Sequence, residues 1–402
     1  IILDEEHYSS YQQVVRCAYD AIDIAFLRSS YHKCPCILGS ATPSIVSMYQ
    51  ANKGQYYLLS LNERPFGIKE PKITMVDMRE ELRDKHTSMF SRKLKSAIDK
   101  RLEKHEQVMV LFNRKGYAPF VMCRQCGDVS KCPTCDVALT YYEQDNKLKC
   151  HYCGYEIPFD KTCHVCHQPT VKSVGVGIEQ VEKAMQKTFP SARIMRMDAN
   201  VTKTKDAHEK LWHAFDTENA DILLGTQMIA KGFDFPKVTL VGVLMADLML
   251  KTPSYRASED AFMLLMQVAG RSGRSMPGDV IIQGYDLEHY ALKDVSLGYD
   301  RFYEEALYER KVSGYEPFNH VYQISAEGSS YLTTYQQLFF LKKLLLKNEN
   351  ITVLGPVPTY IKKKGDQFRF MITIKTSLQD MKTIFDTMQE IKHEDIRLKF
   401  HP

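Results

Sequence analysis

Eight cysteines in four Cys-x2-Cys pairs are the residues of this 402-residue chain whose type and spacing most clearly carry chemistry. In each pair a short loop lets two thiolates bind one tetrahedral Zn²⁺, and two pairs complete a four-thiolate site. The spacing therefore predicts two zinc ions bound by cysteine alone. Structural disulfides are the alternative, but nothing else in the sequence resembles a secreted protein. The pairs are Cys123 and Cys126, Cys132 and Cys135, Cys150 and Cys153, and Cys163 and Cys166.

The fourteen residues between Cys135 and Cys150 indicate how the pairs combine. They are typical of a β-hairpin, with strands at 138–142 and 147–149. Such a hairpin brings the second and third pairs together in an inner site and leaves the first and fourth pairs for an outer one. We favour this nested pairing, and an interleaved arrangement stays open.

A group of carboxylates follows the apolar strand expected at residues 1–3. In nucleotide-hydrolysing α/β folds, the carboxyl end of a strand is where Mg²⁺ and the attacking water are held. We expect Asp4 to hold the metal and Glu5 to polarise the water, within the string Asp4-Glu5-Glu6-His7. Taken alone, this string also fits an ordinary acidic loop.

A Gly-Ser-Ala-Thr-Pro string at residues 39–43 follows the next strand, some thirty residues later. Its short hydroxyl side chains can couple a nucleotide site to a neighbouring strand-binding surface, or they can simply cap a helix. The two strings together are far more specific than either one. They resemble motifs II and III of superfamily 2 helicases.

Two arginines, Arg271 and Arg274, close a helix expected at residues 254–269. Their planar guanidinium groups can both donate hydrogen bonds to one γ-phosphate. The surrounding Gln-x-x-Gly-Arg-x-Gly-Arg string resembles helicase motif VI. After the buried strand at 107–112, Arg114 and Lys115 suit a DNA phosphate contact, with a simple turn as the alternative.

A further string follows the strand expected at residues 220–225. Thr226 lies where we expect a helix to begin, which is a favourable place for a DNA phosphate. Gly232 and Asp234 are expected to face the ribose and the metal.

Strands that alternate with helices must position these residues, and this order predicts an α/β fold with parallel sheets. The cysteines interrupt the second α/β lobe as an insertion at 120–172. We place the end of a first lobe at 1–88, the second lobe at 89–295 and a separate α+β domain at 296–402. The last of these has the β-α-β-β-α-β order of ferredoxin-like domains.

The composition is that of an ordinary globular protein, with 44% hydrophobic and 25% charged residues and a net charge of +4. So small an excess of positive charge is weak evidence for nucleic acid binding. No apolar run approaches the ~20 residues that cross a membrane, and no signal peptide opens the chain. We expect a cytoplasmic protein without a membrane partner.

Taken in order, the motifs and the eight cysteines resemble the bacterial PriA replication-restart helicases, also called primosomal protein N′. The resemblance implies a RecA-like second lobe and a 3′→5′ DNA helicase that uses ATP and Mg²⁺. It further implies recognition of stalled or abandoned forks, unwinding of the lagging strand and loading of the replicative helicase. The implied partners are forked and single-stranded DNA, single-stranded-DNA-binding protein, and primosome and helicase-loading proteins. It also implies nucleotide contacts for His7 and Gln267.

The chain departs from that pattern at two positions, Ile178 and Phe233, where threonine and histidine are expected. A larger departure is the lack of any Gly-x4-Gly-Lys-Ser/Thr string, which cradles the phosphates. We expect this loop upstream of Ile1, and we predict that the chain alone is inactive. A non-catalytic zinc-ribbon fragment that docks DNA or partner proteins is the alternative function. A third class, another superfamily 2 motor such as a restriction translocase, does not account for the cysteines.

Overall fold

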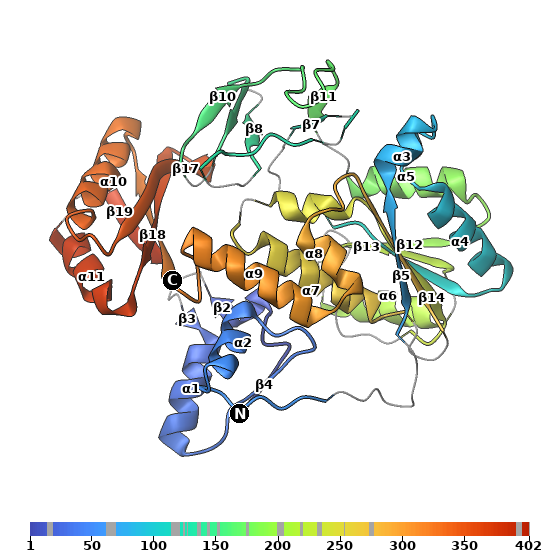
Figure 1. Cartoon of the computed structure of the whole chain (residues 1–402), viewed down its shortest axis with the longest axis horizontal. Helices are drawn as coiled ribbons and strands as arrows, with labels where there is room; N and C mark the ends of the chain where they lie inside the picture. Colours follow the sequence, from blue (N-terminus) through green and yellow to red (C-terminus); the bar gives the residue numbers. More distant parts are fainter. Residues whose placement is uncertain are drawn as a thin grey trace. The chain divides into compact units, whose positions relative to one another are not determined.

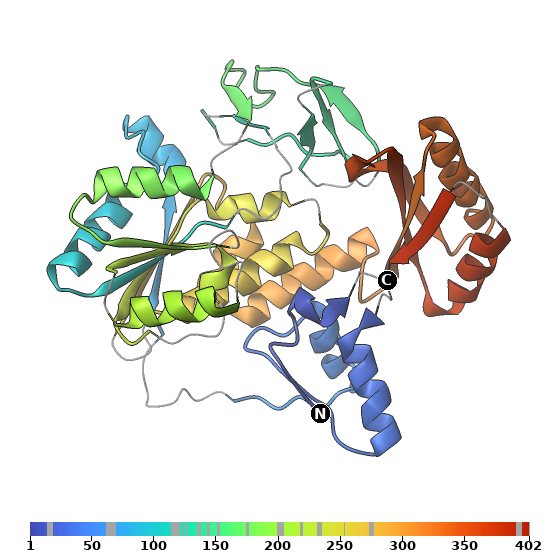
Figure 2. The ribbon, with the colours of Figure 1, turned by 180° about the vertical axis from the view of Figure 1, so that it is seen from behind.

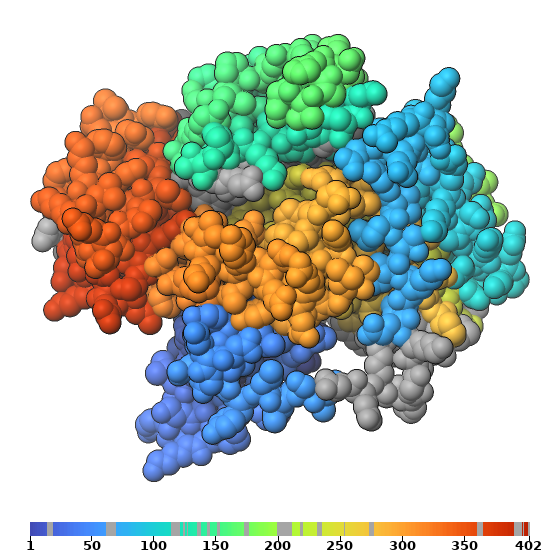
Figure 3. Space-filling view, viewed as in Figure 1, coloured from blue at the N-terminus to red at the C-terminus, as the bar shows by residue number. Residues whose placement is uncertain are grey.

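The computed structural model of the chain forms two compact units. Unit 1 comprises residues Ile1–Leu58, Lys131–Pro158 and Tyr303–Pro402, and unit 2 comprises Leu59–Ser130 and Phe159–Phe302. The residues that are not described are drawn in grey in Figure 3. The structure describes residues 1–13, 19–61, 70–113, 121–123, 125–126, 128–134, 138–142, 145–150, 153–173, 177–198, 205–217, 220–230, 235–252, 254–272, 277–390 and 396–401.

Unit 2 is built on a six-stranded parallel sheet in the order β12-β13-β6-β14-β15-β5. Every residue of the two central strands β6 and β14 is buried, as a strand covered on both faces requires. Figures 1 and 2 show helices α5 (Ile178–Thr188) and α6 (Lys205–Asp216) on opposite faces of this sheet. The strands are β5 (Lys72–Asp77), β6 (Gln107–Leu111), β12 (Ile194–Met197), β13 (Ile222–Gly225), β14 (Val238–Val243) and β15 (Asp279–Gly284).

Helix α4 (Arg92–Glu103) shows how the sequence fixes the packing on this sheet. Ser91 caps the helix by accepting a hydrogen bond from the backbone N–H of Leu94 at 3.2 Å. Leu94 and Ile98 are fully buried. A Cβ atom at Gly242 of β14 would lie 2.9 Å from Leu94 Cδ1, so the glycine lets α4 approach the strand. The other helices of unit 2 include α3 (Met78–Arg83), α7 (Ala257–Ala269) and α8 (Tyr290–Lys293).

Two boundaries differ from those expected from sequence. Strand β5 lies within the stretch 1–88 that we assigned to the first lobe, yet it pairs with β15 at the edge of the unit 2 sheet. A short apolar strand carries no local signal for the sheet it joins. The sequence also predicts an amphipathic helix over residues 14–27. Residues 14–18 lie outside the described part of the chain, and the described helix begins at Ala21, where the Asp20 side chain accepts from Ile22 N at 2.8 Å and caps it.

The N-terminal part of unit 1 centres on two parallel strands, β1 (Ile2–Asp4) and β4 (Ile37–Gly39). Helix α1 (Ala21–His32) lies between them in sequence, and α2 (Ile45–Asn52) follows β4. Both parallel strands therefore deliver the loops that follow them to the same edge.

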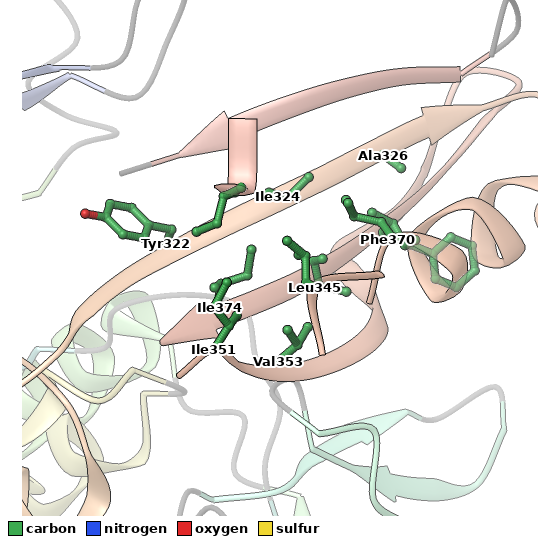
Figure 4. Close-up of a cluster of buried hydrophobic side chains, with 12 residues drawn as sticks. Tyr322, Ile324, Ala326, Leu345, Ile351, Val353, Phe370 and Ile374 are labelled. Carbon is green, nitrogen blue, oxygen red and sulfur yellow. The ribbon is translucent and has the colours of Figure 1, made fainter. Parts of the chain in front are cut away.

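The C-terminal domain is the expected ferredoxin-like fold. Its antiparallel sheet has the order β17-β18-β16-β19, and helices α10 and α11 share one apolar core with it. Figure 4 shows Ile324, Leu345 and Ile374 gathered in that core. After α9 (Tyr299–Ser313), the elements are β16 (His320–Gly328), α10 (Tyr331–Leu345), β17 (Thr352–Lys364), β18 (Gln367–Thr376), α11 (Met381–Glu390) and β19 (Ile396–His401). None of the helices in the described part of the chain is long and apolar enough to cross a membrane.

Candidate metal centres and motor residues

The outer cysteine cluster lies in unit 2, beside the antiparallel strands β7 (Val121–Cys123) and β11 (Val171–Ser173). Its four thiol sulfurs all lie within 4.8 Å of one another. The Sγ atoms of Cys123 and Cys166 are 3.5 Å apart, and those of Cys126 and Cys163 are 3.6 Å apart. The first and fourth pairs of the sequence thus form one group, as the nested pairing predicts.

These distances fit a metal centre and not disulfides. A disulfide would place two sulfurs about 2.05 Å apart. Four thiolates around one zinc ion, each at about 2.3 Å, lie roughly 3.8 Å from each other. The backbone N–H groups of Gln125 and Val165 also point at Cys123 Sγ and Cys163 Sγ, both at 3.4 Å. Such donors stabilise the negative charge of thiolate ligands.

Cys123 shows how the protein prepares a thiolate. Burial raises its pKa, but the Thr170 hydroxyl at 3.1 Å from the sulfur and the backbone N–H groups of Cys126 and Gln125 outweigh this and lower the pKa to about 6. In the described residues, the groups that could hold a metal contain only cysteine. His164 Nε2 lies 3.5 Å from an Asp128 carboxylate oxygen, and the cysteine-only ligand set stays a prediction.

The inner cluster lies in unit 1 and contains Cys132, Cys150 and Cys153. Cys132 Sγ and Cys153 Sγ are 3.5 Å apart, and the fourth expected ligand, Cys135, lies outside the described residues. The expected hairpin is present as β8 (Thr140–Tyr142) and β9 (Lys147–Lys149). A third strand that we did not predict, β10 (Glu156–Pro158), pairs with β9. The described thiols of this cluster also follow the nested pairing.

The carboxylate string at the end of β1 faces the Gly-Ser-Ala-Thr-Pro string at the end of β4, because Asp4 pairs with Gly39 in the parallel register. Asp4 is exposed, and its Oδ1 accepts from the backbone N–H of Glu5 at 3.1 Å. Glu5 is partly exposed and has a left-handed backbone, with φ +52°. An exposed Asp4 and a partly exposed Glu5 are what metal and water binding would require.

His7 joins the two strings. Its ring is buried, and Nδ1 lies 2.8 Å from Ser40 Oγ and 3.7 Å from Glu5 Oε2. Ser40 Oγ in turn accepts from the backbone N–H of Thr42 at 3.0 Å. The histidine therefore ties the two motifs together, and its expected contact with a nucleotide stays a prediction.

In unit 2, Thr226 directly follows β13. Its backbone N–H donates to Met197 O at 3.3 Å, and it precedes a four-residue 3-10 turn, η3 (Gln227–Ala230), in place of the expected α-helix. Gly225 is required here, since a Cβ atom would lie 2.2 Å from Ile229 Cγ2 and 2.7 Å from Met197 O. The phosphate contact expected for Thr226 stays a prediction.

The end of α7 contacts the end of this turn. Arg271, two residues beyond the last residue of the helix, donates from Nε to the carbonyl of Ala230 at 3.0 Å. Arg271 therefore links the string after β13 to the string at the end of α7, both of which we expected to contact the nucleotide. Gln267 is half-buried in the last turn of α7. The other predicted residues of unit 2 lie outside the described residues: Arg114, Lys115, Gly232, Asp234 and Arg274.

Sequence reasoning missed two buried carboxylates. Glu6 contacts the start of α2, and nothing in its own string distinguishes it from Glu5. Asp247 lies beyond the end of β14 and is fully buried. Its Oδ1 accepts from Tyr285 N at 3.1 Å, and burial raises its pKa to about 6.

Two family models match consecutive parts of the chain. Residues 132–158 match the PriA DNA helicase Cys-rich region domain, and residues 161–276 match the helicase conserved C-terminal domain. The first match covers the inner cysteine cluster. The second covers three strands of the unit 2 sheet, β12, β13 and β14, and all of α7.

Curated relatives named replication restart protein PriA are similar along nearly the whole chain. The Bacillus subtilis (strain 168) protein is 43% identical over 381 residues, which cover 93% of this chain and 47% of that protein. The Synechocystis protein is 38% identical over 389 residues, covering 93% and 47%. The Chlamydia pneumoniae protein is 38% identical over 386 residues, covering 94% and 51%. The chain spans about half the length of these relatives.

Solved structures that match part of the chain include RecG bound to a three-way DNA junction, at 14% identity and a TM-score of 0.38, with 69% of this chain and 27% of that chain covered. Another is S. cerevisiae Dbp5 bound to RNA and ADP BeF3, at 12% identity and a TM-score of 0.37, with 78% and 61% covered.

Proposed function

We propose that this chain, which is related over 93% of its length to the replication restart proteins PriA, is the part of an ATP-driven DNA helicase that holds its second lobe. The observation that carries the proposal is the junction of Arg271 with Ala230, at the carboxyl edge of a parallel sheet. A module that only binds DNA does not need an arginine held at this edge, as Arg271 is. The two matched domains, in their observed order, support the same reading.

In the proposed nucleotide site, Asp4 and Glu5 stand at the edge of unit 1. Exposed carboxylate oxygens are the ligands that Mg²⁺ prefers, so Asp4 is suited to hold it and Glu5 to orient the attacking water. When bound, the metal neutralises charge on the phosphates. His7 and Gln267, with Gly232 and Asp234, are proposed to contact the nucleotide.

The proposed site also needs groups that bind the phosphates. Arg271 and Arg274 are proposed to meet the γ-phosphate. The phosphate-cradling string does not occur in the 402 residues, so the proposed ATPase requires a longer chain. We therefore predict that the 402-residue chain alone lacks ATPase activity, with or without single-stranded DNA. Turnover by a clean preparation would show that the nucleotide site is misplaced.

For the longer protein we propose 3′→5′ unwinding of the lagging strand at stalled or abandoned forks, followed by loading of the replicative helicase. Arg114, Lys115 and Thr226 are proposed to contact DNA phosphates. Single-stranded-DNA-binding protein and primosome and helicase-loading proteins are the proposed partners, and the bacterial cytoplasm is the proposed compartment. Support comes from the printed name of the relatives, replication restart protein.

Two zinc ions are proposed for the cysteine clusters. Cysteine thiolates suit zinc, and the described sulfur distances match a tetrahedral centre. A second candidate function, a docking module for DNA or partner proteins, is favoured by one observation. The inner cluster occupies a segment that carries none of the proposed motor residues.

The experiment that tests the proposed function uses the full-length protein and the variant Arg274→Ala. We expect ATP turnover to fall by roughly 10³ to 10⁵ while DNA affinity stays within a few-fold, since an arginine on the transferred phosphoryl group has this effect in related enzymes. Arg274→Lys should rescue little, because a point charge does not reproduce the planar fork. Near-normal turnover with lost DNA binding would overturn the assignment.

A direct test of polarity uses forked DNA with a single-stranded arm of either sense. Unwinding that needs ATP and a 3′ arm on the translocating strand is the expected result. Unwinding from the opposite arm, or without ATP, would contradict the proposal.

A further inference from the structure

The neighbouring glutamates Glu5 and Glu6 have opposite surroundings. Glu5 is partly exposed at the edge of β1, whereas Glu6 is 3% exposed. The Glu6 carboxylate accepts hydrogen bonds from Ser44 N at 2.5 Å, Ser44 Oγ at 3.1 Å and Ser47 Oγ at 3.0 Å. All three donors belong to the first turn of α2, which Ser44 caps. Glu6 thus binds the start of a helix that lies 38 residues away in sequence.

The chemistry of this contact explains why a carboxylate is buried there. The first N–H groups of a helix have no partner inside the helix, and the helix dipole favours negative charge at this end. A buried carboxylate is unfavourable unless it is hydrogen-bonded, and here three donors converge on it. The contact therefore holds the loop after β1 against α2.

This anchor bears on Glu5 through the backbone. Glu5 has φ +52°, a left-handed conformation that residues other than glycine adopt rarely. Such a conformation persists only where the surroundings hold it. The residues on its C-terminal side supply that hold: Glu6 N donates to Gly39 O at 3.1 Å, and His7 lies 2.8 Å from Ser40 Oγ. The Glu6 side chain completes the attachment.

We propose that Glu6 is a positioning residue for the proposed ATPase reaction. By fixing the loop after β1 to the start of α2, it holds Glu5 in the orientation that activates the attacking water. This inference rests on the proposed function, in which Glu5 is the catalytic carboxylate. It predicts that Glu6 acts on the rate of the chemical step and not on the binding of ATP.

Unit 2 offers a matched control. Glu81 is also a buried glutamate at a helix start, where its Oε2 accepts from the backbone N–H of Arg92 at 3.2 Å. Arg92 is the first residue of α4. Glu81 also accepts from Arg92 Nε at 3.1 Å, but it shares with Glu6 a buried carboxylate that binds the start of a helix. It has no proposed catalytic neighbour, so the two positions separate a loss of stability from a loss of catalysis.

The experiment measures kcat and KM for ATP in the full-length protein with saturating single-stranded DNA, together with thermal unfolding. For Glu6→Ala we expect kcat to fall by about 100-fold with KM nearly unchanged, the scale for a misplaced catalytic group. Glu6→Gln should recover most of the rate, because its amide oxygen can accept from Ser44 N and its amide N–H groups can donate to the serine hydroxyls. Glu81→Ala should lower the unfolding temperature and leave kcat unchanged.

Three results would overturn the proposal. In the first, Glu6→Ala keeps kcat within about twofold of the wild type, far from the expected loss. In the second, Glu81→Ala and Glu6→Ala lose kcat equally, in step with their unfolding temperatures. If Glu6→Ala does not fold, Glu6→Asp decides: its shorter side chain should lower kcat, and a normal kcat would be the third overturning result.

The proposed function fails in a different way. In that case the wild-type protein does not hydrolyse ATP, or Glu5→Gln hydrolyses it normally. Either result removes the catalytic role of Glu5, and with it the positioning role of Glu6. Normal wild-type turnover, loss in Glu5→Gln and normal turnover in Glu6→Ala would instead overturn the inference alone.

Discussion

The cysteine-rich segment and the C-terminal domain both contain β-sheets, but different forces hold them. The strands β8, β9 and β10 have three residues each. Among the described residues around them few apolar side chains are buried, and these include Leu139 and Leu148. The C-terminal domain has strands of up to thirteen residues and an apolar core that includes Ile324, Leu341 and Ile372. A segment too small to bury enough apolar surface needs another source of stability, and the thiol clusters provide ligands for one.

One chain can therefore combine a region whose folding depends on metal binding with a domain whose folding depends on an apolar core. A metal-held segment folds only when its ligands are deprotonated and the ion is bound. A domain with an apolar core folds without either condition. Conditions that remove metal should therefore unfold the first region and spare the second.

Zinc removal should have the largest effect. We expect a strong chelator to unfold residues 121–173 and leave the C-terminal domain folded, since zinc binding to such peptides is worth about 10 to 16 kcal/mol at neutral pH. Hydrogen exchange should show lost protection in the first region alone. Metal analysis of the untreated protein should return two zinc ions per chain. One zinc ion, or a histidine ligand, would contradict the cysteine-only assignment.

A core substitution should give the complementary result. Leu341→Ala removes a fully buried side chain of α10 and should lower the free energy of unfolding of the C-terminal domain by about 2 to 5 kcal/mol. Zinc content should stay unchanged. Leu332→Ala, on the same helix but at a side chain that is 61% exposed, is the matched control and should change stability by less than about 0.5 kcal/mol. Denaturant unfolding followed by zinc analysis checks both.

Sequence reasoning succeeded where the signal was local. The ligand spacing of Cys123 and Cys126, the hairpin turn before Lys147 and the buried run of β6 each depend on a few neighbouring residues. The order of elements in the C-terminal domain was also predictable, because its strands and helices alternate with clear periodicity.

Sequence reasoning failed where a contact joins distant segments. Strand β5 could not be assigned to its sheet, because its partner β15 lies about two hundred residues away. The role of Glu6 depends on Ser44, and that of Asp247 on Tyr285. Neither pair leaves a pattern in the residues around it.

Asp247 extends the comparison to a buried carboxyl group outside the cysteine clusters. Burial raises its pKa from 3.8 to about 6, although the Tyr285 N–H and Lys251 act in the opposite direction. Between these pH values the folded protein holds a proton that the unfolded chain has released. The free energy of unfolding should therefore fall as pH rises from about 4 to 6, by up to about 3 kcal/mol in unit 2.

The variant Asp247→Asn should abolish that slope, because an amide does not titrate and its oxygen can still accept from Tyr285 N. Asp221→Asn is a control of opposite sign. The Arg193 guanidinium lowers the pKa of Asp221, so this carboxylate stabilises the fold above its ordinary pKa and loses that contribution as pH falls. Urea unfolding at several pH values measures both slopes. A wild-type slope that survives in Asp247→Asn would assign it to another group.

The smallest effect is expected for an ion pair on the surface of the cysteine-rich segment. Lys149 Nζ lies 3.1 Å from Glu156 Oε2 across the paired strands β9 and β10, and Glu156 also pairs with Lys147. Hydrogen bonds from Lys147 and Lys149 lower the pKa of Glu156, but the carboxylate is exposed and water screens it. Pairs of this kind contribute about 0.2 to 1 kcal/mol.

Glu156→Gln should therefore lower zinc affinity by at most about fivefold, which corresponds to ~1 kcal/mol. Competition with a chromophoric chelator measures that affinity, with Cys150→Ser as the variant that should abolish the inner site. The effect of Glu156→Gln should shrink further at high salt, since ions screen exposed charges. A loss as large as that of Cys150→Ser would mean that the ion pair, and not the thiolate ligands, holds this segment together. In that case the cysteine-rich segment would not be stabilised mainly by its metal ligands, and its contrast with the C-terminal domain would not hold.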